Sequence, residues 1–248
     1  MPDRVVLKVS ALSKRYRTVN AVDGVSFGME SGEIIGILGP NGAGKTTTIN
    51  MILGLIKPTS GSVEVFGKNL STDREEISKT TNFSAVYSHL PPNLTVRQNL
   101  YVFGLLYDVK SLEKKINSLL GEFDLEKYSG TKTGLLSSGE LSRLNLAKAV
   151  INEPRLLLLD EPTASLDPSV AQTIRELITR YVARTGAAVL WASHNMKEIT
   201  TVCKKVFFLS KGKILLSGDP RRLPAEHGKQ DLEELFISMA REPLTFER

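Results

Sequence analysis

A glycine-rich segment in the first fifth of the chain has the spacing of a phosphate-binding loop. Residues 39–46 read Gly-Pro-Asn-Gly-Ala-Gly-Lys-Thr and match the pattern G-x-x-x-x-G-K-[ST] at every fixed position. Glycines let successive backbone N–H groups turn toward one anion, and a following helix adds the positive end of its dipole. Lys45 can neutralise β- and γ-phosphates, and the Thr46 hydroxyl can ligate Mg²⁺. A plain glycine-rich turn is the alternative, but the apolar strand before the loop and the helical pattern after it favour a phosphate site.

Two acidic residues follow a short apolar run later in the chain. Residues 156–159 are all leucine, as expected of a parallel strand that is covered on both faces. A carboxylate at the carboxyl end of such a strand lies where the ligands of open α/β sheets bind. Asp160 can therefore hold Mg²⁺, and Glu161 can orient or deprotonate an attacking water. Alone, the pair would be an acidic turn before Pro162, but beside a phosphate loop it indicates nucleotide hydrolysis.

The elements that must position these groups change in pattern along the chain. Short β-rich segments come first, at 5–12, 25–29, 34–38 and 63–66. Helical periodicity follows at 45–56 and over a mostly helical region of about 89–152, which includes 96–107, 111–123 and 141–151. The later segments are strands at 156–159 and 187–192 around a helix at 170–182, a hairpin at 206–216 and a short helix at 231–240. This order predicts a parallel α/β core with a β-rich front and a helical insertion.

Composition sets wider bounds. The 248 residues are 41% hydrophobic and 24% charged, a balance typical of globular chains rather than disordered or fibrous ones. The longest apolar runs fall far short of the roughly 20 residues that span a bilayer, and the first residues lack the apolar stretch of a signal peptide. Cys203 is the only cysteine, which argues against a disulfide or a thiolate metal cluster and favours a reducing, cytoplasmic compartment. The net charge of +5 identifies no partner.

Further motifs follow in an order shared with one known family. Residues 136–140 read Leu-Ser-Ser-Gly-Glu, residues 165–167 read Ser-Leu-Asp, and His194 follows the strand expected at 187–192. From about residue 5 to residue 216 the chain resembles the ATP-binding subunit of an ABC transporter, most of all the ATPases of ABC-2-type bacterial exporters. In that family the three segments correspond to the signature, usually LSGGQ, the D-loop and the switch histidine.

The resemblance implies a fold and a division of the chain. The fold is α/β: a P-loop NTPase (RecA-like) core with an N-terminal antiparallel β subdomain and an inserted α-helical subdomain. Residues 1–225 would form the ABC ATPase domain, with the helical insertion at about 89–152, and residues 226–248 a short C-terminal helix and tail.

The resemblance also assigns ligands and roles, with ATP and Mg²⁺ as the ligands. Catalysis would fall to Glu161, His194 and Lys45, and Mg²⁺ would be held by Thr46 and Asp160. The residues expected to bind ATP are Tyr16, Gly39, Pro40, Asn41, Gly42, Ala43, Gly44, Lys45, Thr46 and Thr47. The residues expected to contact the ATP of a second subunit are Leu136, Ser137, Ser138, Gly139 and Glu140. The D-loop residues at the subunit interface would be Ser165, Leu166 and Asp167.

Several of these residues also have purely structural explanations. Ser137 and Glu140 form a capping box for the helix that follows. Because a helix N-terminus with serine hydroxyls is also an anion site, both roles are expected together. Asp167 and Pro168 suit the N-cap and the first position of another helix. Tyr16 would stack on adenine in the family, but an aromatic residue in a strand-to-loop region is also common on surfaces.

The chain departs from the family pattern at two places. Ser138 stands where the family usually has glycine and Glu140 where it usually has glutamine, so a working but weaker site is expected. In residues 84–93 the family normally has a glutamine that touches Mg²⁺ and the attacking water, and this chain has none. Ser88 or His89 lies nearest to the expected place. The Mg²⁺ contact there is expected to be weaker or to pass through a water.

The implied function is ATP hydrolysis that powers a membrane transporter, an exporter in the subclass most resembled. Two subunits, with a homodimer favoured over a heterodimer, would close on ATP and drive separate transmembrane permease subunits. The chain would lie on the cytoplasmic face of the membrane, and no nucleic acid is expected. The alternatives are a soluble ABC-type ATPase, a nucleotide-dependent regulator and a P-loop kinase. The single phosphate loop argues against the first, the acidic pair at 160–161 against the second, and the signature segment against the third.

Overall fold

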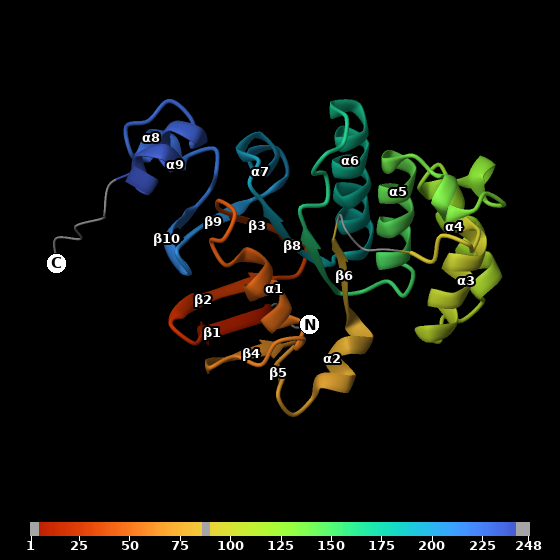
Figure 1. Ribbon diagram of the computed structural model, residues 1–248, viewed down its shortest axis with the longest axis horizontal. Coiled ribbons are helices and arrows are strands. Elements are labelled where there is room, and N and C mark those ends of the chain that lie inside the picture. The colour runs from red at the N-terminus through yellow and green to blue at the C-terminus, as the bar shows by residue number, and fades with distance from the viewer. Residues whose placement is uncertain (1–4, 86–89, 242–248) are drawn as a thin grey trace.

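The structure, a computed structural model, describes residues 5–85 and 90–241, and its strands form two sheets (Figure 1). The antiparallel sheet has the order β2-β1-β4-β5, with β1 Val5–Tyr16, β2 Val19–Glu30, β4 Ser60–Val65 and β5 Lys68–Asn69. The larger sheet has the order β10-β9-β3-β8-β7-β6, with β3 Ile34–Leu38, β6 Thr81–Ala85, β7 Leu156–Asp160, β8 Ala188–Ser193, β9 Lys205–Ser210 and β10 Lys213–Gly218. Its pairs are parallel except β9 with β10. The predicted α/β class with an antiparallel β subdomain is confirmed.

Strand β7 is buried on both faces. Leu157 and Leu159 join a hydrophobic cluster with the helices α5 (Ser138–Ala149), α6 (Pro168–Thr185) and α7 (Met196–Val202). Leu156 and Leu158 face the other way, into a cluster with helix α1 (Lys45–Ile52) and the antiparallel sheet. All four leucines are fully buried. The uninterrupted apolar run thus reflects a strand whose alternating side chains meet two different cores.

Strand β3, the glycine-rich loop and helix α1 follow one another along the chain, as predicted. Helix α1 ends at Ile52, before the predicted end at residue 56. The reason lies in the backbone, where the N–H groups of Leu55 and Ile56 both donate to the Asn50 carbonyl. These bonds replace the i→i−4 ladder, and the chain leaves the helix at Gly54, which has a φ of 68°, although the apolar spacing continues.

Between β6 and β7 the chain is mostly helical, with α3 Val96–Leu106, α4 Leu112–Glu122, the 3-10 turns η1 Glu126–Tyr128 and η2 Thr133–Leu135, and α5. These helices lie together at one end of the molecule in Figure 1. Thr95 and Gln98 form a capping box at the start of α3. Helix α2 (Arg74–Thr80) and strand β6 were not predicted. In α2 only Ile77 is buried, which leaves no apolar periodicity to detect.

The last part of the chain packs against the larger sheet. The predicted hairpin is present, with positive φ angles of 46° at Lys211 and 78° at Gly212 in its turn. Short helix α8 (Leu223–Glu226) and helix α9 (Leu232–Arg241) follow. Leu232 and Leu235 of α9 are buried, and the Phe236 ring stacks on Phe208 of β9. No helix in the described ranges is long and apolar enough to cross a membrane.

The packing of α9 leads to a stability prediction. Leu235 is only 1% exposed, so replacing it with alanine is expected to leave a cavity and lower the free energy of unfolding by about 2–5 kcal/mol. Urea denaturation followed by circular dichroism measures the change. The matched control is Ile237→Ala on the same helix, since Ile237 is 41% exposed and should lose much less. Equal losses for both variants would contradict the packing of α9 on the core.

Candidate functional site

A cleft of about 560 Å³ opens at the carboxyl ends of β3, β6 and β7. The residues that line it are Ala21, Pro40, Asn41, Gly42, Ala43, Gly44, Lys45, Thr46, Thr47, Phe83, Ala85, Asp160 and Glu161. The glycine-rich loop and the acidic pair, which are far apart in sequence, therefore face one space. Of the loop residues predicted to contact ATP, only Gly39 is not among those lining the cleft.

The glycine-rich loop is held between two other turns of the chain. Gly44 has a φ of 106°, and a Cβ atom there would lie 2.4 Å from the Ala21 carbonyl oxygen. The Gly212 N–H donates to the Ala43 carbonyl at 3.0 Å, and the Asp23 N–H donates to the Gly212 carbonyl at 2.8 Å. The start of β2 and the β9–β10 turn thus fix the loop from outside. No residue larger than glycine fits at position 44 without moving this packing.

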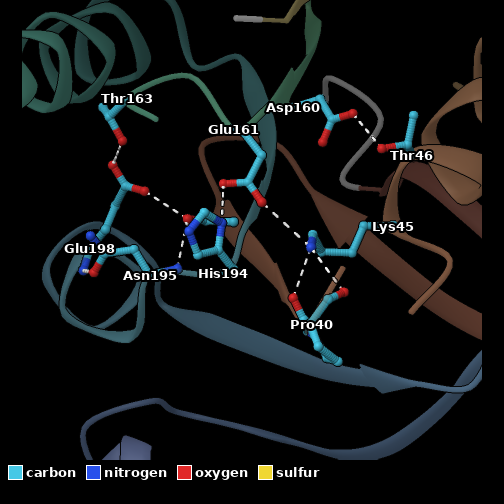
Figure 2. Close-up of polar contacts among 11 residues, drawn as sticks. Pro40, Lys45, Thr46, Asp160, Glu161, Thr163, His194, Asn195 and Glu198 are labelled. Atoms are coloured by element: carbon cyan, nitrogen blue, oxygen red, sulfur yellow. Dashed lines mark hydrogen bonds and ion pairs between the residues drawn. The ribbon is translucent and has the colours of Figure 1, made fainter. Parts of the chain in front are cut away.

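Lys45 is buried at the base of the loop. Its Nζ donates to the carbonyl oxygens of Gly39, at 2.7 Å, and Pro40, at 3.3 Å. It also lies 3.4 Å from Glu161 Oε1, as Figure 2 shows. The two carbonyls hold the ammonium group against the loop. Burying a cation is costly unless it is paired, so a lysine in this position is suited to bind an anionic ligand.

Thr46 and Asp160 meet across the cleft. The Thr46 hydroxyl donates to Asp160 Oδ2 at 2.7 Å (Figure 2). Asp160 Oδ1 is buried and has no hydrogen-bond partner in the described part of the chain. Burial raises the pKa of Asp160, and the Thr46 hydrogen bond opposes that effect. An unpartnered carboxylate oxygen beside a hydroxyl is a donor set that suits a hard divalent cation, so these residues fit Mg²⁺.

Glu161 bridges Lys45 and His194. Its Oε2 lies 2.9 Å from His194 Nδ1, while its Oε1 faces the lysine ammonium group (Figure 2). Glu161 has a φ of 53°, in the left-handed region, and its N–H donates to the Ala192 carbonyl of β8 at 2.9 Å. A strained non-glycine residue at a strand end is typical of functional sites. The carboxylate can accept a proton from a water bound between it and the loop.

The segment 136–140 lies apart from the cleft. The Ser137 N–H donates to Glu140 Oε2 at 2.8 Å and the Glu140 N–H to Ser137 Oγ at 3.4 Å, so the predicted capping box is present. Ser137 and Ser138 are exposed, Leu136 is partly buried, and Gly139 packs closely on α6. Hydrogen bonds lower the pKa of Glu140, and the one from Tyr128 has a larger effect than the one from Ser137.

The other predicted residues occupy different places. In residues 165–167, Ser165 has a φ of 62°, Leu166 packs against the core and Asp167 is the N-cap of α6. The Asp167 side chain makes no capping hydrogen bond, although Pro168 follows as predicted. Tyr16 ends β1, 46% exposed, with Lys14 Nζ 5.1 Å from its ring centre, and it does not line the described cleft. Ser88 and His89 lie outside the described residues.

Some contacts at the site were not predicted. Ala21, Phe83 and Ala85 line the cleft, and no local motif marks them. A buried group around Glu198 joins the loop after Glu161 to the loop that carries His194. These contacts join positions far apart in sequence and depend on which strands are neighbours in the sheet.

A phosphate loop and an acidic strand end that meet in one cleft of a parallel sheet define the protein as a P-loop nucleoside triphosphatase. The model of the ABC transporter family matches residues 22–164. The chain therefore belongs to the ABC transporter family, and within it the chain is an ATP-binding, ATP-hydrolysing subunit.

Relatives and solved structures agree with this assignment. The chain is 34% identical to the Nod factor export ATP-binding protein I of Rhizobium sp. (strain N33), over 94% of its own length and 77% of the relative. It is 36% identical to the protein of the same description from Burkholderia pseudomallei (strain 1710b), over 91% and 74%. One solved ATP-binding subunit of an ABC transporter has a TM-score of 0.84 at 27% identity, covering 95% of this chain and 100% of that one. The cbiO1 protein of Clostridium perfringens, described as part of the ABC transporter complex cbiONQ, has a TM-score of 0.81 at 28% identity, covering 90% and 92%.

Proposed function

We propose that the chain binds Mg–ATP in the cleft and hydrolyses it to power export through separate membrane-spanning subunits. The observation that carries the proposal is the Glu161 carboxylate, which lies between Lys45 and His194 on the cleft wall. The export ATP-binding relatives support the direction of transport. ATP is the substrate expected from the family, and the phosphate loop gives its triphosphate a place to bind.

Each cleft residue has a role in this proposal. Lys45 exchanges its carbonyl contacts for phosphate oxygens. Thr46 and Asp160 are the residues that would hold Mg²⁺, which would neutralise charge on the phosphate oxygens. Glu161 orients the attacking water and takes its proton as the water oxygen bonds to the γ-phosphorus and the bond to the β–γ bridging oxygen breaks. His194 holds the γ-phosphate.

We further propose that two copies of the chain close face to face around ATP. The support is the position of residues 136–140: the N-terminus of α5 and the Ser137 hydroxyl are exposed but do not line the cleft of their own chain. A helix N-terminus of this kind is an anion site. It can reach the γ-phosphate only in a second copy, which makes the ATP site complete in the dimer alone.

This dimer leads to a prediction for Ser137. Ser137→Ala should remove one cap bond, lowering the free energy of unfolding by about 1 kcal/mol, and should also weaken ATP-dependent dimerisation. The matched control is Thr95→Ala, because Thr95 caps α3 with the same box geometry and has no proposed ATP contact. Size-exclusion chromatography with ATP in a non-hydrolysing background measures dimer formation. Equal dimerisation in the two variants would contradict the proposed contact.

The proposed membrane partner has a place to bind. A cleft of about 850 Å³ lies between the turn after α1, helix α2, strand β6 and the helices α3 and α5, lined by residues that include Leu55, Phe83, Phe103, Leu106 and Tyr107. Leu55 and Leu106 are exposed there, and apolar side chains that gather in one exposed patch mark contact surfaces. We infer that a cytoplasmic segment of the membrane subunit fills it, which would place the chain at the cytoplasmic face of the membrane.

Purification of the chain from detergent-solubilised membranes of the cells that express it tests this arrangement. The complex should co-purify from detergent and show ATP-dependent transport in vesicles, whereas Leu106→Asp should lower recovery of the complex. The control, Ile237→Asp, places the same charge on an exposed aliphatic position of α9 and should leave recovery intact. An ATPase that never associates with membrane subunits would overturn the transport role.

A further inference from the structure

A buried carboxylate links the two loops that carry Glu161 and His194. Glu198 lies on α7 and is 3% exposed. Its Oε1 accepts a hydrogen bond from the Thr163 hydroxyl (Figure 2). Its Oε2 accepts one from the Ser193 hydroxyl at 2.8 Å. Thr163 and Ser193 are themselves buried. Thr163 follows Glu161 by two positions, and Ser193 directly precedes His194.

The same carboxylate shapes the backbone on both sides of His194. The Ser193 hydroxyl, which donates to Glu198, accepts from the Asn195 N–H at 3.0 Å. Asn195 Oδ1 in turn accepts from the Glu198 N–H at 3.2 Å. The residues before and after the histidine are therefore both fixed by one closed set of hydrogen bonds. Each member has its partner, which makes such a buried polar network rigid.

His194 depends on this backbone support because its own side chain is poorly packed. The side chain is 58% exposed, and its ring is held by the contact with Glu161 Oε2. Packing cannot set the direction of a ring that faces solvent. Its position relative to Glu161 must come from the loops themselves.

The loop of residues 161–165, which begins at Glu161, also has a conformation that it would not hold alone. Glu161 and Ser165 both have positive φ angles, of 53° and 62°, in a stretch of five residues. Non-glycine residues in this region are strained and persist only where the surroundings determine them. The hydrogen bond from Thr163, midway between them, is a tether of that kind.

We propose that Glu198 is a positioning residue for ATP hydrolysis: it holds His194 in line with Glu161 through Ser193 and Thr163. The proposal rests on the proposed roles of Glu161 and His194. Glu198 is buried and is not among the residues that line the cleft. It sets the distance and direction between the Glu161 and His194 side chains.

Glu198→Gln tests the role with little change of shape. A carboxylate accepts from both hydroxyls, whereas the glutamine amide group has one acceptor oxygen and a donating nitrogen. One hydroxyl proton loses its partner, and the two loops shift relative to each other. Because displacements of about 1 Å can reduce catalysis by up to about 100-fold, kcat is expected to fall roughly 10- to 100-fold with ATP affinity unchanged.

The same substitution in a His194→Ala background gives the decisive comparison. If Glu198 acts by positioning His194, removing the histidine first should leave Glu198→Gln with no further effect on kcat. Similar fold losses in both backgrounds would overturn the proposal. Full hydrolysis by His194→Ala alone would instead count against the proposed role of His194.

A spectroscopic measurement separates positioning from folding. The chain has only three histidines, His89, His194 and His227, so their ring nitrogens can be assigned by ¹⁵N NMR. The wild type should show an Nδ1–H of His194 hydrogen-bonded to a carboxylate, and Glu198→Gln should lose that signature while the His227 signal stays. An unchanged His194 signal would overturn the proposal even if hydrolysis fell.

Two variants of Thr163 test the same hydrogen bond from its other end, in case Glu198→Gln does not fold. Thr163→Val removes the hydroxyl at constant shape and should reproduce the loss of kcat and of the His194 signature, whereas Thr163→Ser should restore most of both. The control is Thr200→Val, which removes a hydroxyl from α7 that donates to the Met196 carbonyl. The same loss in Thr200→Val would show a general effect on α7 and overturn the proposal.

Discussion

Replacing Lys45 with alanine is expected to abolish tight Mg–ATP binding. The substitution removes a buried ammonium group that lies at the base of the phosphate loop and bonds the carbonyl oxygens of Gly39 and Pro40. Hydrogen bonds from a cation to phosphate oxygens are among the strongest in proteins. A loss of about 3 kcal/mol is expected, which corresponds to roughly 100-fold in affinity. Isothermal titration with ATP and Mg²⁺ measures it.

The control for Lys45→Ala separates the effect of losing this side chain from the effect of losing one positive charge. Lys57 lies on the surface shortly after α1, and Lys57→Ala removes the same charge without touching the cleft. It should bind ATP as the wild type does. If Lys45→Ala also kept its affinity, the loop would not be the nucleotide site.

Replacing Glu161 with glutamine should have the second large effect, on hydrolysis rather than on binding. The amide keeps the shape of the side chain but cannot take the proton of the attacking water. General-base catalysis contributes roughly 100- to 10,000-fold, so kcat should fall in that range. Because ATP stays bound, the two copies of the proposed dimer should remain together. Size-exclusion chromatography and phosphate release measure the two outcomes.

Glu64→Gln is the matched control for Glu161→Gln. Glu64 lies on β4 and pairs with Lys8 on the surface of the antiparallel sheet. Its substitution changes the charge equally and should leave hydrolysis intact. A monomeric Glu161→Gln protein that hydrolyses ATP at the normal rate would remove Glu161 from the mechanism.

The parts of the site that could be predicted from sequence are those in which one short segment specifies its own geometry. The glycines of residues 39–46 set a loop, the leucines of 156–159 require cover on two faces, and the Ser137–Glu140 pair closes a helix end by itself. In each case the local chemistry leaves few alternatives, and the described structure contains the loop, the strand and the cap.

The remaining contacts depend on pairing between distant strands. Thr163 meets Glu198 because β7 lies beside β8 in parallel register, and the approach of Ala21 to Gly44 depends on the fold of the antiparallel sheet. Nothing within either segment indicates its partner. The early end of α1 has a similar cause, since the apolar spacing runs on beyond Ile52 while the backbone turns. Helix α2 has too few buried residues to produce a helical periodicity of apolar residues in the sequence.

The clamped phosphate loop also bears on how binding free energy is used. The β9–β10 turn and the start of β2 already hold the loop through Gly212 and Ala21. The loop is therefore preorganised, and little of its conformational entropy is lost when a nucleotide enters the cleft. In the proposed dimer, more of the interaction free energy would then remain for binding a second copy to the bound triphosphate. The rigidity of the loop would thereby favour ATP-dependent association of the two copies as well as hydrolysis.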